Sequence, residues 1–262
     1  MPFGLAVAIS AAIALVAWRA RALSSDGALA AIAVGTAILW PTGWPGFVVL
    51  AVYFTTSTLV SRLAATVGAR QSDQADTEVR NRWQVLANGG PAALGALAGF
   101  ATPGLGVWLA TIALAASGGD TWATAMGSLS PRPPRDILRV QAVTPGTSGG
   151  VTWFGTTGGV VGAALIGLAG TAASGLRPLF LVAATTGLAA LLLDSIMGSA
   201  AQARFRCDAC GVETERRQHR CGGRTTLARG WPWLDNDAVN AVASGLALIV
   251  GFGWWIWLKP AT

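Results

Sequence analysis

The hydrophobic positions of the chain fall into long continuous runs separated by short polar connections. Several runs are shorter than the ~20 residues that cross a bilayer unaided, so flanking polar residues would complete them. A membrane β-barrel is disfavoured, because its strands alternate polar and apolar positions. The pattern predicts an all-α polytopic membrane protein with eight spans, or seven if residues 26–61 form one hairpin broken at Pro41 and Pro45. The runs cover residues 4–18, 26–40, 44–61, 83–101, 104–118, 151–172, 177–199 and 238–258.

The composition agrees with a membrane protein. Hydrophobic residues make up 53% of the chain and charged residues 11%, against about 25% charged residues in soluble domains. We expect a single helical membrane domain over residues 1–262, with residues 201–235 as a cytosolic loop inserted between the last two spans. The first run is not expected to be a signal peptide, because its basic residues, Arg19 and Arg21, follow the apolar segment.

The basic residues are concentrated in every second connection. Counted from the N-terminus, the odd connections hold all of the 18 basic residues except Arg177 and Lys259. Because cytosolic loops are rich in Lys and Arg, this predicts eight spans with both termini outside, in the cytoplasmic (inner) membrane of a prokaryote. Topology therefore explains the net charge of +6, and no nucleic acid partner is expected. Residues 62–82 are expected to form a cytosolic helix or ordered loop, with a solvated linker as the alternative.

Five polar side chains lie within or beside the predicted spans at one depth, near their cytosolic ends. A bare carboxylate in lipid costs at least ~2.5–3.5 kcal/mol, so such residues are usually paired, hydrated or bound to a cation. Their common depth predicts a shared polar cavity that faces the cytosol. They are Asn88, Asp120, Asp194, Asp237 and Asn240.

The connection after Asp120 combines arginines with a glycine-rich turn. Free backbone N–H groups in such a turn, next to the start of a helix, can bind an anion. Acid, cations and turn together predict a metal and phosphate site. The alternative is a surface loop with glycine caps and membrane-anchoring arginines. The candidate phosphate-binding residues are Arg132, Arg135, Arg139, Gly146, Thr147, Ser148, Gly149 and Gly150.

A second candidate metal site lies in the last cytosolic connection. All three cysteines and the only histidine have the spacing Cys207-x2-Cys210-x8-His219-x-Cys221. A CxxC pair followed by a second ligand pair is typical of a structural zinc site. The alternative is reduced thiols without a metal. A disulfide is disfavoured, because the cytosol is reducing.

Several enzyme classes are excluded. A P-loop needs a lysine after its glycines, and the only lysine, Lys259, lies at the far end of the chain. Protein-kinase motifs and a Ser/His/Asp triad cannot be assembled either. Carboxylate, amide and arginine chemistry remains, and phosphoryl transfer needs little more.

Longer motifs resemble those of a known family. The motifs are Gln84-Val85-Leu86-Ala87-Asn88-Gly89-Gly90, Asp120-Thr121-Trp122-Ala123-Thr124, Pro131-Arg132, Gly146-Thr147-Ser148-Gly149-Gly150-Val151, Asp194-Ser195-x-x-Gly198 with Gln202, and Asp235-Asn236-Asp237-x-Val239-Asn240. From about residue 26 to the last span, the chain resembles the integral-membrane family of unknown function that contains plastid phytyl-phosphate kinase and the animal transmembrane-protein-nineteen group. That family is distantly similar to CTP-dependent phytol and dolichol kinases and to CDP-diacylglycerol synthase. Gly119 and Ala125 replace a serine and a glutamate of the family pattern.

The resemblance implies an isoprenyl monophosphate kinase acting on phytyl- or geranylgeranyl-type lipids. A nucleoside triphosphate, CTP by analogy, would donate the phosphoryl group at the cytosolic face of the bilayer. Asp120 and Asp194 would hold Mg²⁺, and Asn88 and Asn240 would orient these two carboxylates. The arginines, the turn and Asp237 would bind the triphosphate.

Two other functional classes stay open. Acids within the membrane and spans broken by glycine also occur in transporters, so the chain could move a lipid or a small anion as a transporter or flippase. A structural membrane protein without chemistry is the third alternative. The sequence leaves open whether the chain forms a homo-oligomer.

Overall fold

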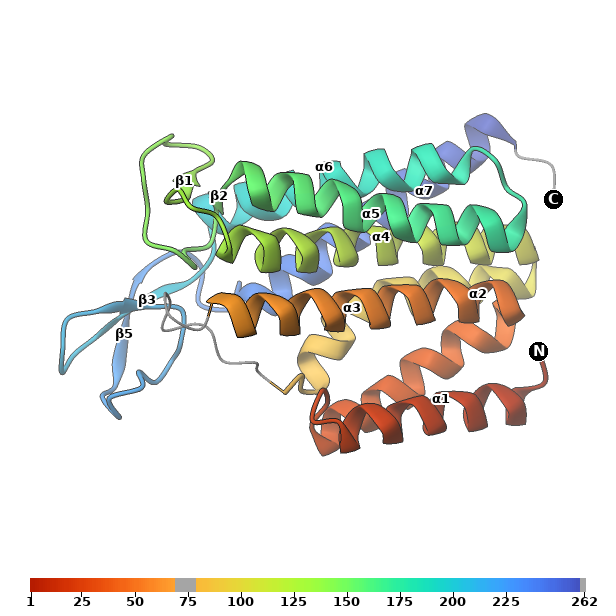
Figure 1. Cartoon of the computed structure of the whole chain (residues 1–262), viewed down its shortest axis with the longest axis horizontal. Coiled ribbons are helices and arrows are strands. Elements are labelled where there is room, and N and C mark those ends of the chain that lie inside the picture. Colours follow the sequence, from red (N-terminus) through yellow and green to blue (C-terminus); the bar gives the residue numbers. More distant parts are fainter. Residues whose placement is uncertain (69–78, 260–262) are drawn as a thin grey trace.

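The computed structural model describes residues 1–68 and 79–259, most of them in helices that run back and forth as a bundle (Figure 1). The predicted all-α polytopic fold is confirmed. The helices are α1 (Phe3–Arg19), α2 (Ser25–Gly68), α3 (Arg82–Leu97), the short 3-10 helix η1 (Ala98–Phe100), α4 (Pro103–Ser128), α5 (Trp153–Ser174), α6 (Leu179–Ala200) and α7 (Asn236–Leu258).

Helix α2 contains two of the predicted spans. Its backbone breaks at Gly43, where φ is +65° and ψ is −143°, a conformation that residues with a side chain rarely adopt. Pro41 and Pro45 flank the break, and the two arms run in opposite directions (Figure 1). Dividing α2 at Gly43 gives eight α-helical segments in the described residues, the number of apolar runs. Residues 69–78, the middle of the predicted 62–82 connection, lie outside the described residues.

Helix length and apolarity agree with a membrane location. Within the described ranges, four helices are long and apolar enough to cross a bilayer by themselves, and these are α2, α5, α6 and α7. Helix α1 is apolar but only 17 residues long. The bundle therefore has the architecture of a polytopic membrane protein.

Two small antiparallel sheets lie together at one end of the bundle. Strand β1 (Arg135–Asp136) pairs with β2 (Gly150–Val151), and β3 (Arg204–Cys207) pairs with both β4 (Glu213–Thr214) and β5 (Thr225–Arg229). We call this end, formed by residues 129–152 and 201–235, the loop end. The N-terminus and the end of α7 lie at the opposite end (Figure 1).

Side-chain caps fix the helices that start at the loop end. The Asn81 side chain accepts from the backbone N–H groups of Trp83 and Gln84, and the Gln84 side chain accepts from the Asn81 N–H group. Thr152 caps α5 and Asp235 caps α7, with N–H to oxygen distances of 2.9 and 3.0 Å. Each cap stabilises its helix by about 1 kcal/mol. The caps thus set where α3, α5 and α7 begin.

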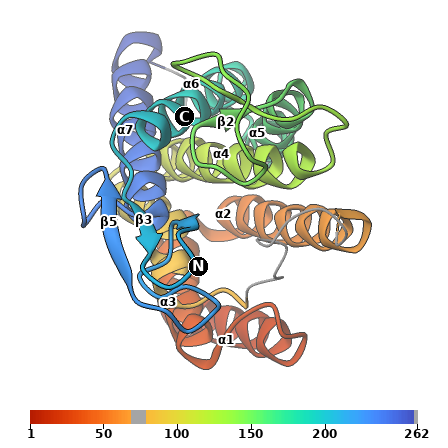
Figure 2. The same ribbon diagram turned by 90° about the vertical axis from the view of Figure 1, so that its left-hand side faces the viewer.

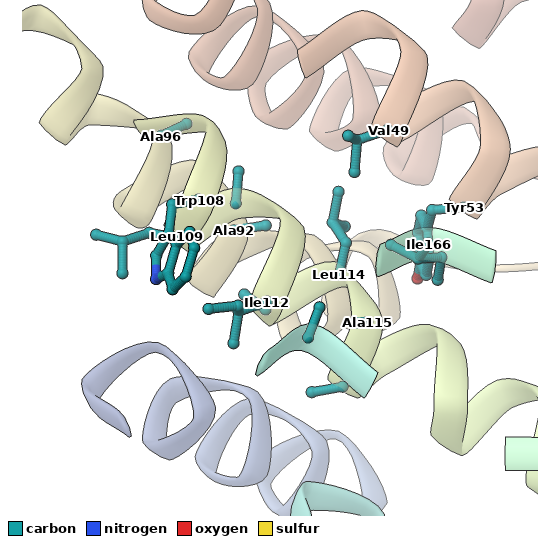
Figure 3. Close-up of a cluster of buried hydrophobic side chains, with 14 of the residues drawn as sticks. Val49, Tyr53, Ala92, Ala96, Trp108, Leu109, Ile112, Leu114, Ala115 and Ile166 are labelled. Atoms are coloured by element: carbon teal, nitrogen blue, oxygen red, sulfur yellow. The ribbon is translucent and has the colours of Figure 1, made fainter. Parts of the chain in front are cut away.

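Helix α4 is the centre of the bundle, and it contacts α2, α3, α5, α6 and α7 (Figure 2). Its residues 106–119 are all buried. Trp108 is fully buried and donates its indole N–H to the backbone oxygen of Gly251 in α7, at 2.8 Å. Figure 3 shows Leu114 of α4 in the same cluster of buried side chains as Val49 of α2. Asp120 follows this buried stretch directly, so the core packing fixes its position.

Candidate functional site

Asp120 of α4 and Asp194 of α6 lie near each other in the last third of their helices, on the side of the loop end. Small residues let these helices approach closely, since a Cβ added at Gly187 would lie 3.1 Å from the Ala115 backbone oxygen. The Asp194 carboxylate interacts electrostatically with those of Asp120 and Glu215. Its Oδ2 atom is buried and has no hydrogen-bond partner among the described residues. Adjacent acids of this kind repel each other unless a cation or a proton lies between them.

The turn formed by residues 146–150 packs directly on the end of α6. Gly149 has a φ of +81°, and a Cβ added there would lie 2.5 Å from the Ser199 nitrogen. A Cβ added at Gly198 would lie 2.8 Å from the Gly149 nitrogen. Only glycine therefore fits at both positions. Gly198 follows Asp194 by four residues, so the turn lies about one helical turn from that acid.

The turn already binds a carboxylate, that of Glu215. The Ser148 N–H and hydroxyl groups both donate to Glu215 Oε1, the N–H at 3.1 Å, and Gln202 Nε2 donates to Glu215 Oε2 at 3.0 Å. Glu215 is a site residue that sequence reasoning missed. It lies beside Arg216 and Arg217 on a polar loop, and no local signal separates it from other surface acids.

Two further arginines, outside the predicted phosphate-binding set, contact the turn and the end of α6 on which it packs. Arg204 donates to the Ser148 backbone oxygen at 2.6 Å, and Arg229 donates to the Ser199 backbone oxygen at 2.9 Å. Arg204 Nε and Arg229 Nη2 are buried without a partner in the part of the chain that the structure describes. Burial and the nearby Arg229 charge lower the pKa of Arg204, but arginine starts above 12 and stays cationic.

The three predicted arginines have other neighbours. Arg139 Nη1 lies 3.2 Å from Asp136 Oδ2 and 3.4 Å from Ser199 Oγ. Arg135 donates to the Val140 backbone oxygen of its own loop at 3.4 Å, and Arg132 is exposed. Of the three, Arg139 is the one that the structure joins to α6.

The remaining polar residues of the predicted site are spread over α3 and α7. Asn88 donates to the Gln84 backbone oxygen of its own helix at 2.9 Å. Asn240 is 7% exposed, and its Oδ1 atom has no hydrogen-bond partner within the described ranges. Asp237 is half-buried in the first turn of α7. The Ser117 hydroxyl donates to the Asn88 backbone oxygen at 2.8 Å and links α3 to α4.

A cavity of about 320 Å³ lies between α1, both arms of α2, and α3. Its walls are mostly apolar, and its polar lining includes Arg80, Gln84, Asn88 and Thr121. Thr121 is the neighbour of Asp120 in α4, and the cavity-lining Tyr53 interacts electrostatically with Asp120 and Arg80. The cavity lining includes Asn88 but not the other four residues expected to share a cavity.

The four predicted zinc ligands converge at the loop end and form what we call the Cys3His cluster. Their ligand atoms all lie within 4.8 Å of one another. The sulfur to sulfur distance is 3.5 Å for Cys207 and Cys221 and 3.9 Å for Cys210 and Cys221, and His219 Nδ1 lies 3.0 Å from Cys221 Sγ. Sulfurs on a tetrahedral zinc at ~2.3 Å lie about 3.8 Å apart. The cluster therefore has the dimensions of a zinc site.

Comparisons with known proteins identify the family. The family described as integral membrane protein DUF92 matches residues 8–248. The chain is 33% identical over 196 residues to an uncharacterized membrane protein of Methanocaldococcus jannaschii, covering 74% of this chain and 80% of the relative. It is 29% identical over 270 residues to Protein PGR of Arabidopsis thaliana, covering 91% of each. No solved structure matches. These matches confirm the resemblance that the motifs indicate, and the chain belongs to the DUF92 family of integral membrane proteins.

Proposed function

We propose that the protein is an isoprenyl monophosphate kinase of a prokaryotic cytoplasmic membrane. It would transfer a phosphoryl group from a nucleoside triphosphate, with CTP the expected donor, to a phytyl- or geranylgeranyl-type monophosphate. The observation that carries the proposal is the apolar cavity whose polar end adjoins Asp120. The bilayer is as apolar as the cavity, so the lipid chain would be held by close packing rather than by transfer out of water. The bound chain would place its phosphate beside Asp120.

In this proposal Asp120 and Asp194 hold Mg²⁺. The buried Asp194 Oδ2 atom without a partner in the described residues supports a bound cation, and Mg²⁺ prefers oxygen ligands. When bound, Mg²⁺ would offset the negative charge of the phosphates. Asn88 and Asn240 would orient the two carboxylates.

The nucleotide would bind at the loop end. The Ser148 N–H and hydroxyl groups, which hold a carboxylate, have the chemistry to hold a phosphate oxygen. Arg204 and Arg229 would add positive charge beside this turn, together with the predicted arginines. Asp237 would contact the nucleotide from the first turn of α7.

The proposal is tested by CDP release from CTP on addition of geranylgeranyl monophosphate and Mg²⁺ to protein in lipid nanodiscs. Asp120→Asn and Asp194→Asn should each lower turnover at least about 100-fold, as expected for loss of an electrostatic group at the reacting phosphates. Asp26→Asn, a matched change at the start of α2, should leave turnover unchanged. A wild-type protein that turns over no nucleotide but moves lipid across vesicles would contradict the proposal and favour a transporter or flippase.

The cavity is tested separately. Ala51 lines the cavity, so Ala51→Leu should raise the KM for the lipid about tenfold, because the larger side chain overlaps the space that the lipid would fill, and should leave the KM for CTP unchanged. Ala12→Leu adds the same side chain at an exposed position of α1 and is the control. An unchanged lipid KM in Ala51→Leu would exclude the cavity as the lipid site.

A further inference from the structure

The segment 201–235 has little apolar surface to fold around. Its sheet consists of strands of four, two and five residues, and sheets this small are marginal without further support. The buried apolar side chains of the segment include Ala203, Phe205 and Leu234. Its basic residues are Arg204, Arg206, Arg216, Arg217, Arg220, Arg224 and Arg229. An ordered structure here needs a cross-link.

The Cys3His cluster lies where a cross-link would order all three strands. Cys207 ends β3, Cys221 precedes β5, and Cys210 and His219 flank β4 on its two sides. The described cysteines are free thiols. Three thiolates and an imidazole select zinc over harder cations, and four protein ligands leave no open position for a substrate.

The ordered loop presents Glu215 to the turn. Glu215 directly follows β4, whose Thr214 pairs with Phe205 of β3. The acid is half-buried, and its two oxygens accept from Ser148 and Gln202. A carboxylate thus lies on the N–H and hydroxyl groups that are the candidate anion ligands of the turn, close enough to Asp194 for the two charges to interact.

We infer that the Cys3His cluster binds one Zn²⁺, and that the zinc-ordered loop holds Glu215 in the turn as an internal anion. The second part rests on the proposed function, because the anion that Glu215 keeps out of the turn would be a substrate phosphate. Glu215 then competes with phosphate, so phosphate binds only when Glu215 leaves. The loop is in this way a regulatory element of the same site.

The zinc is tested by elemental analysis of the purified full chain. About one zinc per chain is expected, and Cys210→Ser should lose it. Asp208→Asn, a matched change of an exposed residue between Cys207 and Cys210, should retain the zinc. If Cys210→Ser does not fold, chelation of the wild-type protein followed by Co²⁺ should give the visible absorption of tetrahedral thiolate coordination. A metal-free wild-type protein of full thermal stability would overturn the inference.

The role of Glu215 is tested by binding of inorganic pyrophosphate, without nucleotide or lipid. If Glu215 occupies the turn in about nine of ten molecules, it weakens pyrophosphate binding about tenfold. Glu215→Gln should therefore strengthen pyrophosphate binding about tenfold. Glu213→Gln, an exposed acid two residues earlier, should not. Equal affinity in both variants would overturn the internal anion. Because zinc content and pyrophosphate affinity need no turnover, these results stand or fall separately from the kinase assay.

Discussion

Asp136 is a buried carboxylate whose charge is compensated by several neighbouring groups. It is 3% exposed, and it accepts from the backbone N–H groups of Leu138 and Arg139 at 3.0 and 2.8 Å. The Ser199 hydroxyl donates to it at 2.8 Å, and the Arg139 guanidinium lies 3.2 Å away. Burial without such partners would be costly. Because Ser199 belongs to α6, this acid ties the loop of residues 129–152 to the helix that carries Asp194.

We predict that this tie weakens in acid. Burial raises the pKa of Asp136, but its hydrogen bonds and the Arg139 charge outweigh burial and lower the pKa to about 2. A lowered pKa stabilises the fold fully above the unfolded value of about 3.9, and this stabilisation is lost as the pH falls toward 2. Asp136→Asn should destabilise by about 1.5–3 kcal/mol at pH 7. Thermal unfolding measurements should show that the stability difference between Asp136→Asn and the wild type becomes smaller below pH 4.

The control for this prediction is Asp208→Asn, since Asp208 is exposed. Its melting temperature should follow that of the wild type at every pH. A constant difference between Asp136→Asn and the wild type from pH 7 to pH 3 would show that the charge of Asp136 does not stabilise the fold.

The two departures from the family pattern have simple structural settings. Ala125 packs with Val60 and Ala64 of α2 in a small apolar cluster. A Cβ added at Gly119 would lie 3.2 Å from the Gly159 backbone oxygen of α5, so a serine there would be tight. The Asp120 and Asp194 pair thus forms here without the two family side chains.

At the scale of elements, the contact between the turn of residues 146–150 and α6 assembles the candidate site. Gly149 and Gly175 both have positive φ, of +81° and +76°, but an added Cβ at Gly175 meets nothing within 4 Å. Gly175→Ala should therefore cost only the left-handed backbone penalty of about 1–2 kcal/mol. Gly149→Ala should cost more, because the Cβ also displaces the turn from Ser199. Thermal unfolding should rank the two variants, and pyrophosphate binding should fall only in Gly149→Ala.

Equal melting temperatures of the two variants would contradict this account. They would mean that the turn moves off α6 without cost, so that its contact with Gly198 does not hold the site together. The comparison separates strain from contact, because both positions require the same backbone conformation.

The elements could be predicted from the sequence to the extent that their causes are local. The apolar runs place most helix ends within a few residues, and Pro41, Gly43 and Pro45 mark the break in α2. Two helices continue through polar residues beyond their predicted runs: α2 ends at Gly68 rather than 61, and α4 ends at Ser128 rather than 118, so Asp120 lies inside a helix. The Cys3His spacing likewise brings its four ligands together. Glu215 and Asp136 could not be found in this way, because their partners, Ser148 and Ser199, lie 67 and 63 residues away. Tertiary packing alone selects them from the other acids.

Over the whole molecule, charge is distributed along the axis of the bundle. The loop end holds most of the arginines of the described residues, whereas Arg177 belongs to the connection between α5 and α6 and Lys259 directly follows α7. That connection and the end of α7 lie at the opposite end of the bundle (Figure 1). Exposed tryptophans lie at both ends of the bundle, with Trp40 and Trp44 beside the break in α2 and Trp231 and Trp233 in the loop end. Tryptophan at both ends is expected at the two membrane interfaces, and the concentration of arginine at one end is the asymmetry of a protein oriented in a bilayer.

We predict from this asymmetry that the loop end faces the cytosol. Epitope tags placed beside Arg135 and Arg216 should be protected from antibody in intact cells and become accessible after permeabilisation. A periplasmic reporter enzyme fused to either terminus should be active, since the N-terminus and the end of α7 lie at the opposite end. If the tags beside Arg135 and Arg216 lie on opposite faces of the membrane, the eight helical segments cannot all be transmembrane spans. Both tags outside would invert the molecule, and Asp120, Asp194 and the turn of residues 146–150 would then face away from cytosolic nucleotide, which contradicts the proposed kinase.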